Sequence, residues 1–367
     1  MKRIITIFFI LISYALFCQD TLPGKKLYVN LNAHYGFIIP HHRNMEYLIK
    51  SHVPAGELNF ILQTNGAKRW EQVYKNPEKG LGLYFADLGN AEQLGQAIGI
   101  FPFVNFPLNP DRKFKLYIRA SDGIGLITKP YNRIDNHKNN INGSLLNAFI
   151  NLKLNSVFYP AKNMRMETGI GLSHLSNGAW TMPNLGINIA TVNVGISFKK
   201  SENKNQQSAI IQAVKPDTLK QKYFFTIIAA AGQNEASAPD GKKYAAYSVY
   251  ATEWKTVSEK SRFCMGADAF YEMKNLATAE RDTLFDTSNK LNNLQLGLRF
   301  GYELVVGKFS LPLEMGAYVF SKTTVKGPLY HRIGIRYQAT QHFIINYTLK
   351  THWATAENVE FGIGYKF

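Results

Sequence analysis

The hydropathy pattern of this chain constrains its fold more than any single motif does. After residue 17 no run of eighteen apolar residues occurs, so no later segment predicts a transmembrane helix. Instead, segments of about ten residues alternate between apolar and polar side chains. A period of two is typical of β-strands with one apolar and one polar face. The pattern predicts strands at 26–39, 54–64, 80–88, 95–106, 113–126, 143–158, 164–176, 188–199, 222–232, 244–254, 262–272, 292–305, 308–320, 329–338, 342–352 and 358–367.

The start of the chain has the pattern of a secretory signal peptide, which we expect over residues 1–18. A short positive region, residues 1–3, precedes an apolar core over residues 4–17. This core is too short to cross a membrane as a helix. A lipidated Cys18 would follow small residues, whereas the two residues before it are bulky. Ordinary cleavage near Cys18 is therefore the favoured interpretation.

An export signal followed by many alternating segments predicts an all-β fold, a transmembrane antiparallel β-barrel in the outer membrane of a Gram-negative bacterium. Only helices and closed barrels satisfy every backbone polar group in lipid. We expect residues 19–367 to form a single barrel with an even number of strands, about twelve to sixteen, with sixteen as the central value. The last strand ends on Phe367. It resembles the terminal strand through which the barrel assembly machinery recognises such proteins.

The breaks between predicted strands give the orientation. Those after 106, 158, 305 and 338 are short, and those after 39, 126, 176 and 272 are longer and polar. Because external loops are longer than periplasmic turns, residues 177–187 are expected outside. Two long breaks, 65–79 and 200–221, fall where short turns are expected. The second is a polar linker or a periplasmic excursion, and it could join two eight-stranded halves. We favour one barrel, since separate halves would each have to close their own edges.

The charge balance limits the partners. Lys and Arg outnumber Asp and Glu by 42 to 26, which gives a net charge of +16. No nucleic-acid-binding signature accompanies this excess, so phosphorylated lipid is the favoured partner. In that case the basic residues should be concentrated in the outer loops. The alternative is that they lie in solvated loops and bind no partner. Removal of the signal peptide leaves Cys264 as the single cysteine, which excludes a disulfide framework and a cysteine metal site. No cofactor is expected.

Three further groups of polar residues fit a functional site less well. His41 and His42 precede Arg43 without a nearby carboxylate, so they resemble a metal or anion site only superficially. Asp135 lies in a predicted outer loop, where a solvated role is favoured. His352 and Glu357 flank a predicted tight turn and are expected to face water.

The hairpin formed by 164–176 and 188–199 carries the strongest candidate site. In its first strand, Ile170 and Leu172 share one parity, and His174 and Ser176 continue it. Asn188 falls on the apolar parity of the returning strand. Alternate residues lie roughly 6.6 Å apart along a strand, so an imidazole can reach a hydroxyl two positions away. A nucleophile, a base and an orienting group on one apolar face are what acyl transfer requires.

The same residues carry a family resemblance. The pattern His174-x-Ser176-Asn177 followed by Pro183-Asn184-x-Gly186-x-Asn188 is similar to the active-site hairpin of outer-membrane lipid A deacylases of the PagL type. The resemblance implies a barrel whose Ser-His pair faces lipid and hydrolyses an ester-linked acyl chain of lipid A. It makes Ser176 the nucleophile and His174 the base. Asn177, Gly178 and Asn184 would bind the oxyanion and substrate, with Gly178 and Pro183 shaping the loop.

This chain departs from the family pattern at one position, because Asn188 stands where the family has a glutamate. An amide can fix the tautomer of an imidazole but cannot stabilise imidazolium by charge. Either another carboxylate such as Asp135 supplements it, or the enzyme is slow, or activity has been lost. Two functions follow: a lipid A deacylase in the outer leaflet, or a non-enzymatic channel or structural barrel that retains the hairpin.

Overall fold

A computed structural model describes residues 26–161, 163–199, 222–235, 241–279, 289–322, 327–353 and 355–367. The expected signal peptide and the polar segment 200–221 lie outside these residues. None of the helices in the described ranges is long and apolar enough to cross a membrane.

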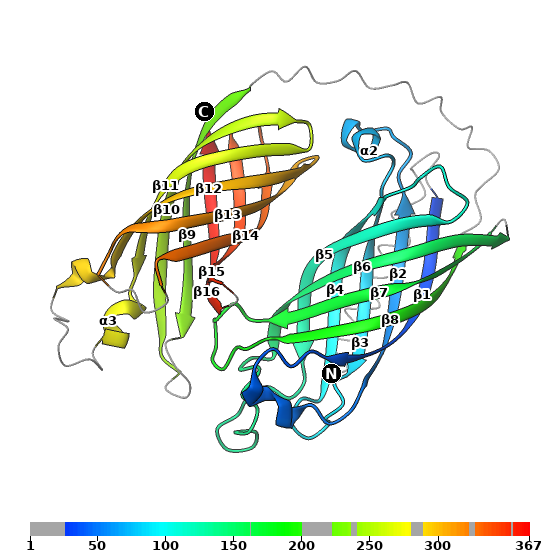
Figure 1. Cartoon of the computed structure of the whole chain (residues 1–367), viewed down its shortest axis with the longest axis horizontal. Coiled ribbons are helices and arrows are strands. Elements are labelled where there is room, and N and C mark those ends of the chain that lie inside the picture. Colours follow the sequence, from blue (N-terminus) through cyan, green and yellow to red (C-terminus); the bar gives the residue numbers. More distant parts are fainter. Residues whose placement is uncertain are drawn as a thin grey trace.

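The strands form two closed antiparallel barrels of eight strands each (Figure 1). The strands of the first barrel, β1 to β8, are Lys26–Ile38, Val53–Gln63, Glu78–Asp87, Gln96–Pro107, Lys115–Ile127, Leu146–Ala161, Met164–Ser176 and Ile187–Lys199. Those of the second, β9 to β16, are Tyr223–Glu235, Lys243–Ser258, Ser261–Glu272, Leu294–Val306, Phe309–Ser321, Leu329–Gln338, Phe343–His352 and Thr355–Lys366. The short helices are η1 (Arg43–Leu48), α2 (Arg69–Val73), α3 (Lys274–Ala279) and η2 (Lys290–Asn293).

Within the described residues the expected total of sixteen strands is confirmed, but the expectation of a single barrel is wrong. Strand β1 pairs with β8 from Tyr28 opposite Lys199 to Ile38 opposite Ile189, which closes the first ring. Strand β16 pairs with β9 and closes the second. Each half therefore closes on itself and leaves no unpaired strand edge, which was the objection to two separate halves. Alternation along a strand fixes which face is apolar, but it does not say which strand closes the ring.

Each barrel encloses a set of buried charged residues. In β7, Arg165 and Glu167 are buried, whereas Ile170 and Leu172 are 59% and 39% exposed on the outer wall. In the first lumen Glu57 Oε1 accepts from Arg119 at 2.6 Å and from Lys153 at 2.9 Å. Eight strands leave an interior that side chains just fill.

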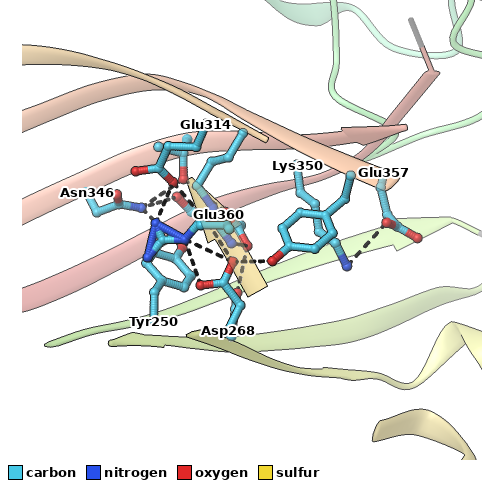
Figure 2. Close-up of polar contacts among 12 residues, drawn as sticks. Tyr250, Asp268, Glu314, Asn346, Lys350, Glu357 and Glu360 are labelled. Atoms are coloured by element: carbon cyan, nitrogen blue, oxygen red, sulfur yellow. Dashed lines mark hydrogen bonds and ion pairs between the residues drawn. The ribbon is translucent and has the colours of Figure 1, made fainter. Parts of the chain in front are cut away.

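The second lumen holds a similar network, shown in Figure 2. Arg332 contacts Asp268 at 3.1 Å and Glu360 at 2.7 Å, and Arg336 contacts Glu314 at 2.8 Å. All five side chains are buried. Charges that are removed from lipid and paired in this way fill the barrel instead of lining an aqueous pore.

The expectation that His352 and Glu357 face water is wrong. Both are buried, with His352 Nδ1 3.1 Å from Glu357 Oε2. Lys350 Nζ lies 3.3 Å from the same carboxylate, and Figure 2 shows this contact between Lys350 and Glu357. His352 has the lumen-facing parity of β15, as Lys350 does. Glu357 lies at a register shift, where Lys350 pairs with Asn358 and Thr351 with Ala356, and both Glu357 and Asn358 are buried.

The long segment between β2 and β3 is explained by contact between the barrels. It contains α2, and Arg69 Nε and Nη2 donate to the Glu259 carboxylate in the β10–β11 turn at 2.7 and 2.5 Å. The Tyr74 hydroxyl donates to the carbonyl of Val305 at 2.6 Å. The end of the barrels that holds the β2–β3 segment and the β10–β11 turn is called the inner end. The opposite end, which holds loop 177–186, is called the outer end.

Candidate active site

The β7–β8 hairpin brings three predicted site residues into direct contact. His174 stands opposite Asn188 in the strand register. His174 Nδ1 lies 2.6 Å from Asn188 Oδ1, and His174 Nε2 lies 2.9 Å from Ser176 Oγ. An amide oxygen can only accept, so Nδ1 carries the proton and donates to Asn188. Nε2 is then left to accept the hydroxyl proton of Ser176.

The three residues lie on the outer wall near the outer end of the first barrel. Their neighbours of the opposite parity, Ser173 and Leu175, are 2% and 0% exposed and face the lumen. Polar groups on a lipid-facing wall are costly and are typical of functional sites. The outward orientation expected from strand parity is therefore confirmed.

The loop after β7 is built around Asn177. Its side chain donates to the carbonyl of Thr181 at 2.9 Å and accepts from the Thr181 amide at 3.3 Å. Its backbone N–H donates to Asn184 Oδ1 at 3.0 Å. Both groups of Asn177 are thus used to shape the loop, which does not fit the expected role as an oxyanion donor. Within the described residues no partner occupies the Gly178 N–H or Asn184 Nδ2, which leaves these two donors for an oxyanion.

Two glycines are required by the backbone of this loop. Gly178 has φ +63° and is followed by Ala179 at φ +65°, in a turn that is closed by a 3.2 Å bond from the Trp180 N–H to the carbonyl of Asn177. Gly186 has φ +79°, and a Cβ there would lie 2.9 Å from His174 Cε1. Positive φ is disfavoured for residues with a Cβ, so glycine is the suitable residue at both positions.

The loop between β5 and β6 supports the site from one side. The N–H groups of Leu185 and Gly186 donate to the carbonyl of Ile141 at 2.8 and 3.3 Å. Asn142 forms an isolated bridge with Asn184. Asp135, which was considered as a supplementary carboxylate, is instead exposed in this loop, and its backbone N–H bonds Asn132 Oδ1.

The structure places His41 behind Asn188, a contact that the sequence did not predict. His41 Nδ1 lies 3.2 Å from Asn188 Nδ2, and His41 Nε2 lies 2.9 Å from the carbonyl of Leu185. The β1–β8 pairing causes this neighbourhood, because the Ile39 N–H donates to the carbonyl of Asn188 at 2.8 Å. His41 could have been assigned to this site only if the pairing of β1 with β8 had been known.

An apolar groove of about 660 Å³ lies on the same outer wall. It includes Leu172, two residues before His174, and Ala190, two residues after Asn188. Its other apolar lining residues are Tyr35, Phe37, Ile118, Leu152, Leu154, Ile170 and Val192. The polar site therefore adjoins a surface that an acyl chain can contact.

The expected concentration of basic residues at the outer end is not seen. Among the described residues, exposed cations occur there, for example Arg43 and Lys129, but also at the inner end, for example Arg112 and Lys308. Because the charge is spread over both ends, the net charge of the chain gives no support for a phosphorylated substrate at one of them.

Comparison with known families separates the chain at the boundary between the barrels. Residues 55–197 match the family model described as lipid A 3-O-deacylase (PagL), and residues 222–367 match the model described as acyloxyacyl hydrolase, C-terminal domain (PagL_C). Each half of the chain is thus similar to a PagL-type family model. These two matches and the barrel fold place the protein in the outer membrane of a Gram-negative bacterium.

Solved structures similar to this chain include outer-membrane barrels. Neisserial surface protein A is 9% identical, with a TM-score of 0.34, over 48% of this chain and 99% of that protein. The outer membrane enzyme PagL is 16% identical, with a TM-score of 0.31, over 45% of this chain and 97% of that one. No curated protein gives a significant match.

Proposed function

We propose that this protein removes an ester-linked acyl chain from lipid A in the outer leaflet, with Ser176 as nucleophile and His174 as general base. The observation that carries the proposal is the hydrogen-bonded array of Ser176, His174 and Asn188 on the lipid-facing wall. Acyl chains of lipid A lie along that wall, so a pair that faced the lumen would not meet the ester.

The chemistry follows from the proton positions. His174 Nε2 takes the proton of Ser176 as Oγ attacks the ester carbonyl carbon, and the Gly178 N–H and Asn184 Nδ2 donate to the oxyanion. When the tetrahedral intermediate collapses, the sugar oxygen leaves and takes the proton from His174. Water then attacks the acyl-enzyme, again with His174 as base, and the fatty acid and Ser176 are released.

His41 explains how an amide can replace the family carboxylate. In a serine triad, a change from Asp to Asn costs about 10⁴ in rate because the histidine adopts the wrong tautomer. In the neutral tautomer in which His41 Nε2–H donates to the carbonyl of Leu185, His41 Nδ1 accepts from Asn188 Nδ2. The carbonyl of Ile39, 3.3 Å from Nδ1, is then not a hydrogen-bond partner. The bond from Asn188 to His41 turns Asn188 Oδ1 toward His174 and favours the productive tautomer. The charge of the carboxylate is lost, but the orientation is kept.

The alternative of a non-enzymatic channel is disfavoured by the filled lumens. Glu57, Arg119 and Lys153 are buried and paired in the first barrel, as are Asp268 and Arg332 in the second. A water-filled pore would leave such groups solvated. Nothing in the described residues favours a channel over a hydrolase.

The test is mass spectrometry of lipid A from outer membranes or liposomes exposed to wild type, Ser176→Ala and His174→Ala. Wild type is expected to remove an acyl chain, and both variants are expected to lose that activity. Ser173→Ala is the matched control, because Ser173 lies on the same strand but faces the lumen. An identical acylation pattern with wild type and Ser176→Ala on every lipid A tested would refute the hydrolase.

A further inference from the structure

The second barrel contacts the loop that carries the proposed oxyanion donors. Glu235, the last residue of β9, uses both its backbone and its side chain. Its N–H donates to the carbonyl of Ala179 at 3.0 Å, and its Oε2 accepts the Met182 N–H at 2.8 Å. Glu235 is 4% exposed, so water competes little for these bonds.

Lys243, the first residue of β10, binds the same loop from the next strand. Its Nζ donates to the carbonyl of Trp180 at 2.5 Å and to Thr181 Oγ1 at 2.8 Å. The same ammonium group lies 5.4 Å from the centre of the Trp180 ring, within cation–π range. Two strands of the second barrel therefore contact four consecutive residues of the loop, 179–182.

The outer wall of the second barrel also packs against Gly178. A Cβ at this position would lie 2.4 Å from Val359 Cγ2 and 3.3 Å from Leu349 Cδ1. The close approach leaves no room for a side chain. Figure 1 shows the tip of the β7–β8 hairpin beside β15 and β16, in agreement with these distances.

The inner-end contact keeps the two barrels in place. Besides the bonds from Arg69 to Glu259 and from Tyr74 to Val305, Lys260 Nζ lies 4.9 Å from the Tyr74 ring centre. The barrels are therefore joined at both ends, about one strand length apart. A rotation of one barrel that broke the outer contacts would also have to break the inner ones.

A loop with this geometry needs such support. Gly178 and Ala179 are consecutive residues with positive φ, a conformation that is unfavourable for a residue with a Cβ. Such a conformation persists only where the surroundings determine it. The bonds from Glu235 and Lys243 end on the residues that follow Gly178, whose N–H is one proposed oxyanion donor.

We propose that the second barrel is part of the catalytic unit: Glu235 and Lys243 are positioning residues that hold loop 177–182 in the shape in which Gly178 and Asn184 bind the oxyanion. This inference rests on the proposed hydrolase. It gives the second barrel a role in the reaction although that barrel lacks the Ser-His pair.

The test combines two measurements on the full chain in lipid. The first is hydrogen exchange of loop 177–182, which does not depend on activity. The Met182 N–H should exchange faster in Glu235→Ala than in wild type. The second is steady-state hydrolysis of lipid A. Loss of an oxyanion donor costs roughly 10²–10³ in kcat, so partial misplacement in Glu235→Ala should lower kcat about 10- to 100-fold with little change in KM.

Matched variants separate positioning from general damage. Glu235→Gln keeps a carbonyl acceptor for the Met182 N–H and should restore most of kcat. Lys243→Met should lower kcat, whereas Lys255→Met, an exposed lysine at the other end of β10, should leave both measurements unchanged. Heat-modifiable migration in detergent should stay that of wild type in all four variants.

The outcomes are distinguishable. Faster exchange together with lower kcat supports the proposal. Unchanged exchange in Glu235→Ala, or faster exchange with wild-type kcat, overturns it. If wild type hydrolyses no lipid A, the proposed function fails, and with it the catalytic role of the second barrel; the exchange data would still show whether Glu235 holds the loop.

Discussion

His174 Nδ1 lies 2.6 Å from Asn188 Oδ1, so Asn188 contacts the imidazole directly across the β7–β8 hairpin. The contact supplies orientation without charge. Serine hydrolases use their carboxylate for both purposes, so this pair separates the two contributions.

Substitution of Asn188 measures the separate contributions of orientation and charge. Asn188→Ala should lower kcat for lipid A hydrolysis by less than Ser176→Ala or His174→Ala does, because it removes orientation and leaves the nucleophile and the base. Asn188→Glu restores the family carboxylate and should hold or raise the rate. Steady-state assays on lipid A liposomes give these values. If Asn188→Glu abolishes an activity that wild type shows, another residue orients His174.

Substitution of His41 tests whether this residue fixes the orientation of the Asn188 side-chain amide. In His41→Ala the Asn188 amide is free to rotate and to present Nδ2 to His174, so kcat should fall about 3- to 30-fold, a part of the roughly 10⁴ cost of the wrong tautomer. His42→Ala is the control. In an Asn188→Glu background the His41 substitution should cost much less, because a carboxylate accepts from either oxygen. Equal losses in both backgrounds would show that His41 acts independently of Asn188.

Gly186 is predicted not to tolerate substitution by alanine, for two reasons. Gly186→Ala imposes a Cβ at φ +79° and places it 2.9 Å from His174 Cε1. Strain of about 1–3 kcal/mol is expected, together with a large loss of activity from displacement of the imidazole. Gly327→Ala shares the positive φ, but its Cβ has no atom within 4 Å. That control should be destabilised while it keeps wild-type kcat, as measured by thermal unfolding and hydrolysis.

The inner contact between the barrels should weaken in acid. The hydrogen bond from Arg69 holds the pKa of Glu259 below its ordinary value. A carboxyl whose folded pKa is lowered stabilises the fold above its unfolded pKa, and this contribution is lost as the pH falls through the folded pKa. Glu259→Gln should therefore lower the unfolding temperature near neutral pH and differ little from wild type in strong acid. A difference that grows toward low pH would have the wrong sign. The two side chains are 32% and 28% exposed, so the effect should be small and sensitive to salt.

Strand positions and strand faces were predictable because alternation is a local property. Arg165 and Glu167 face the lumen and Ile170 and Leu172 the outer wall, as their parity predicts. The contact of His174 with Ser176 and Asn188 follows from the same parity and from the hairpin register. The catalytic roles of these residues stay a prediction.

Ring closure was not predictable, because it joins strands that are distant in sequence. The pairing of β1 with β8 divides the strands into two barrels and brings His41 to Asn188. The contact of Glu235 with Met182 depends in addition on how the two barrels pack. A sequence pattern holds no information on either arrangement.

The most direct measurement of the central claim is to identify the residue that is acylated or trapped during the reaction. Purified wild type would be treated with a long-chain alkyl fluorophosphonate, which reacts with activated serines, and digested for peptide mass spectrometry. If Ser176 is the nucleophile and His174 the base, a single adduct is expected on Ser176. This adduct should be absent in Ser176→Ala and strongly reduced in His174→Ala. An adduct on a different serine, or none on an enzyme that removes acyl chains from lipid A, would contradict this assignment.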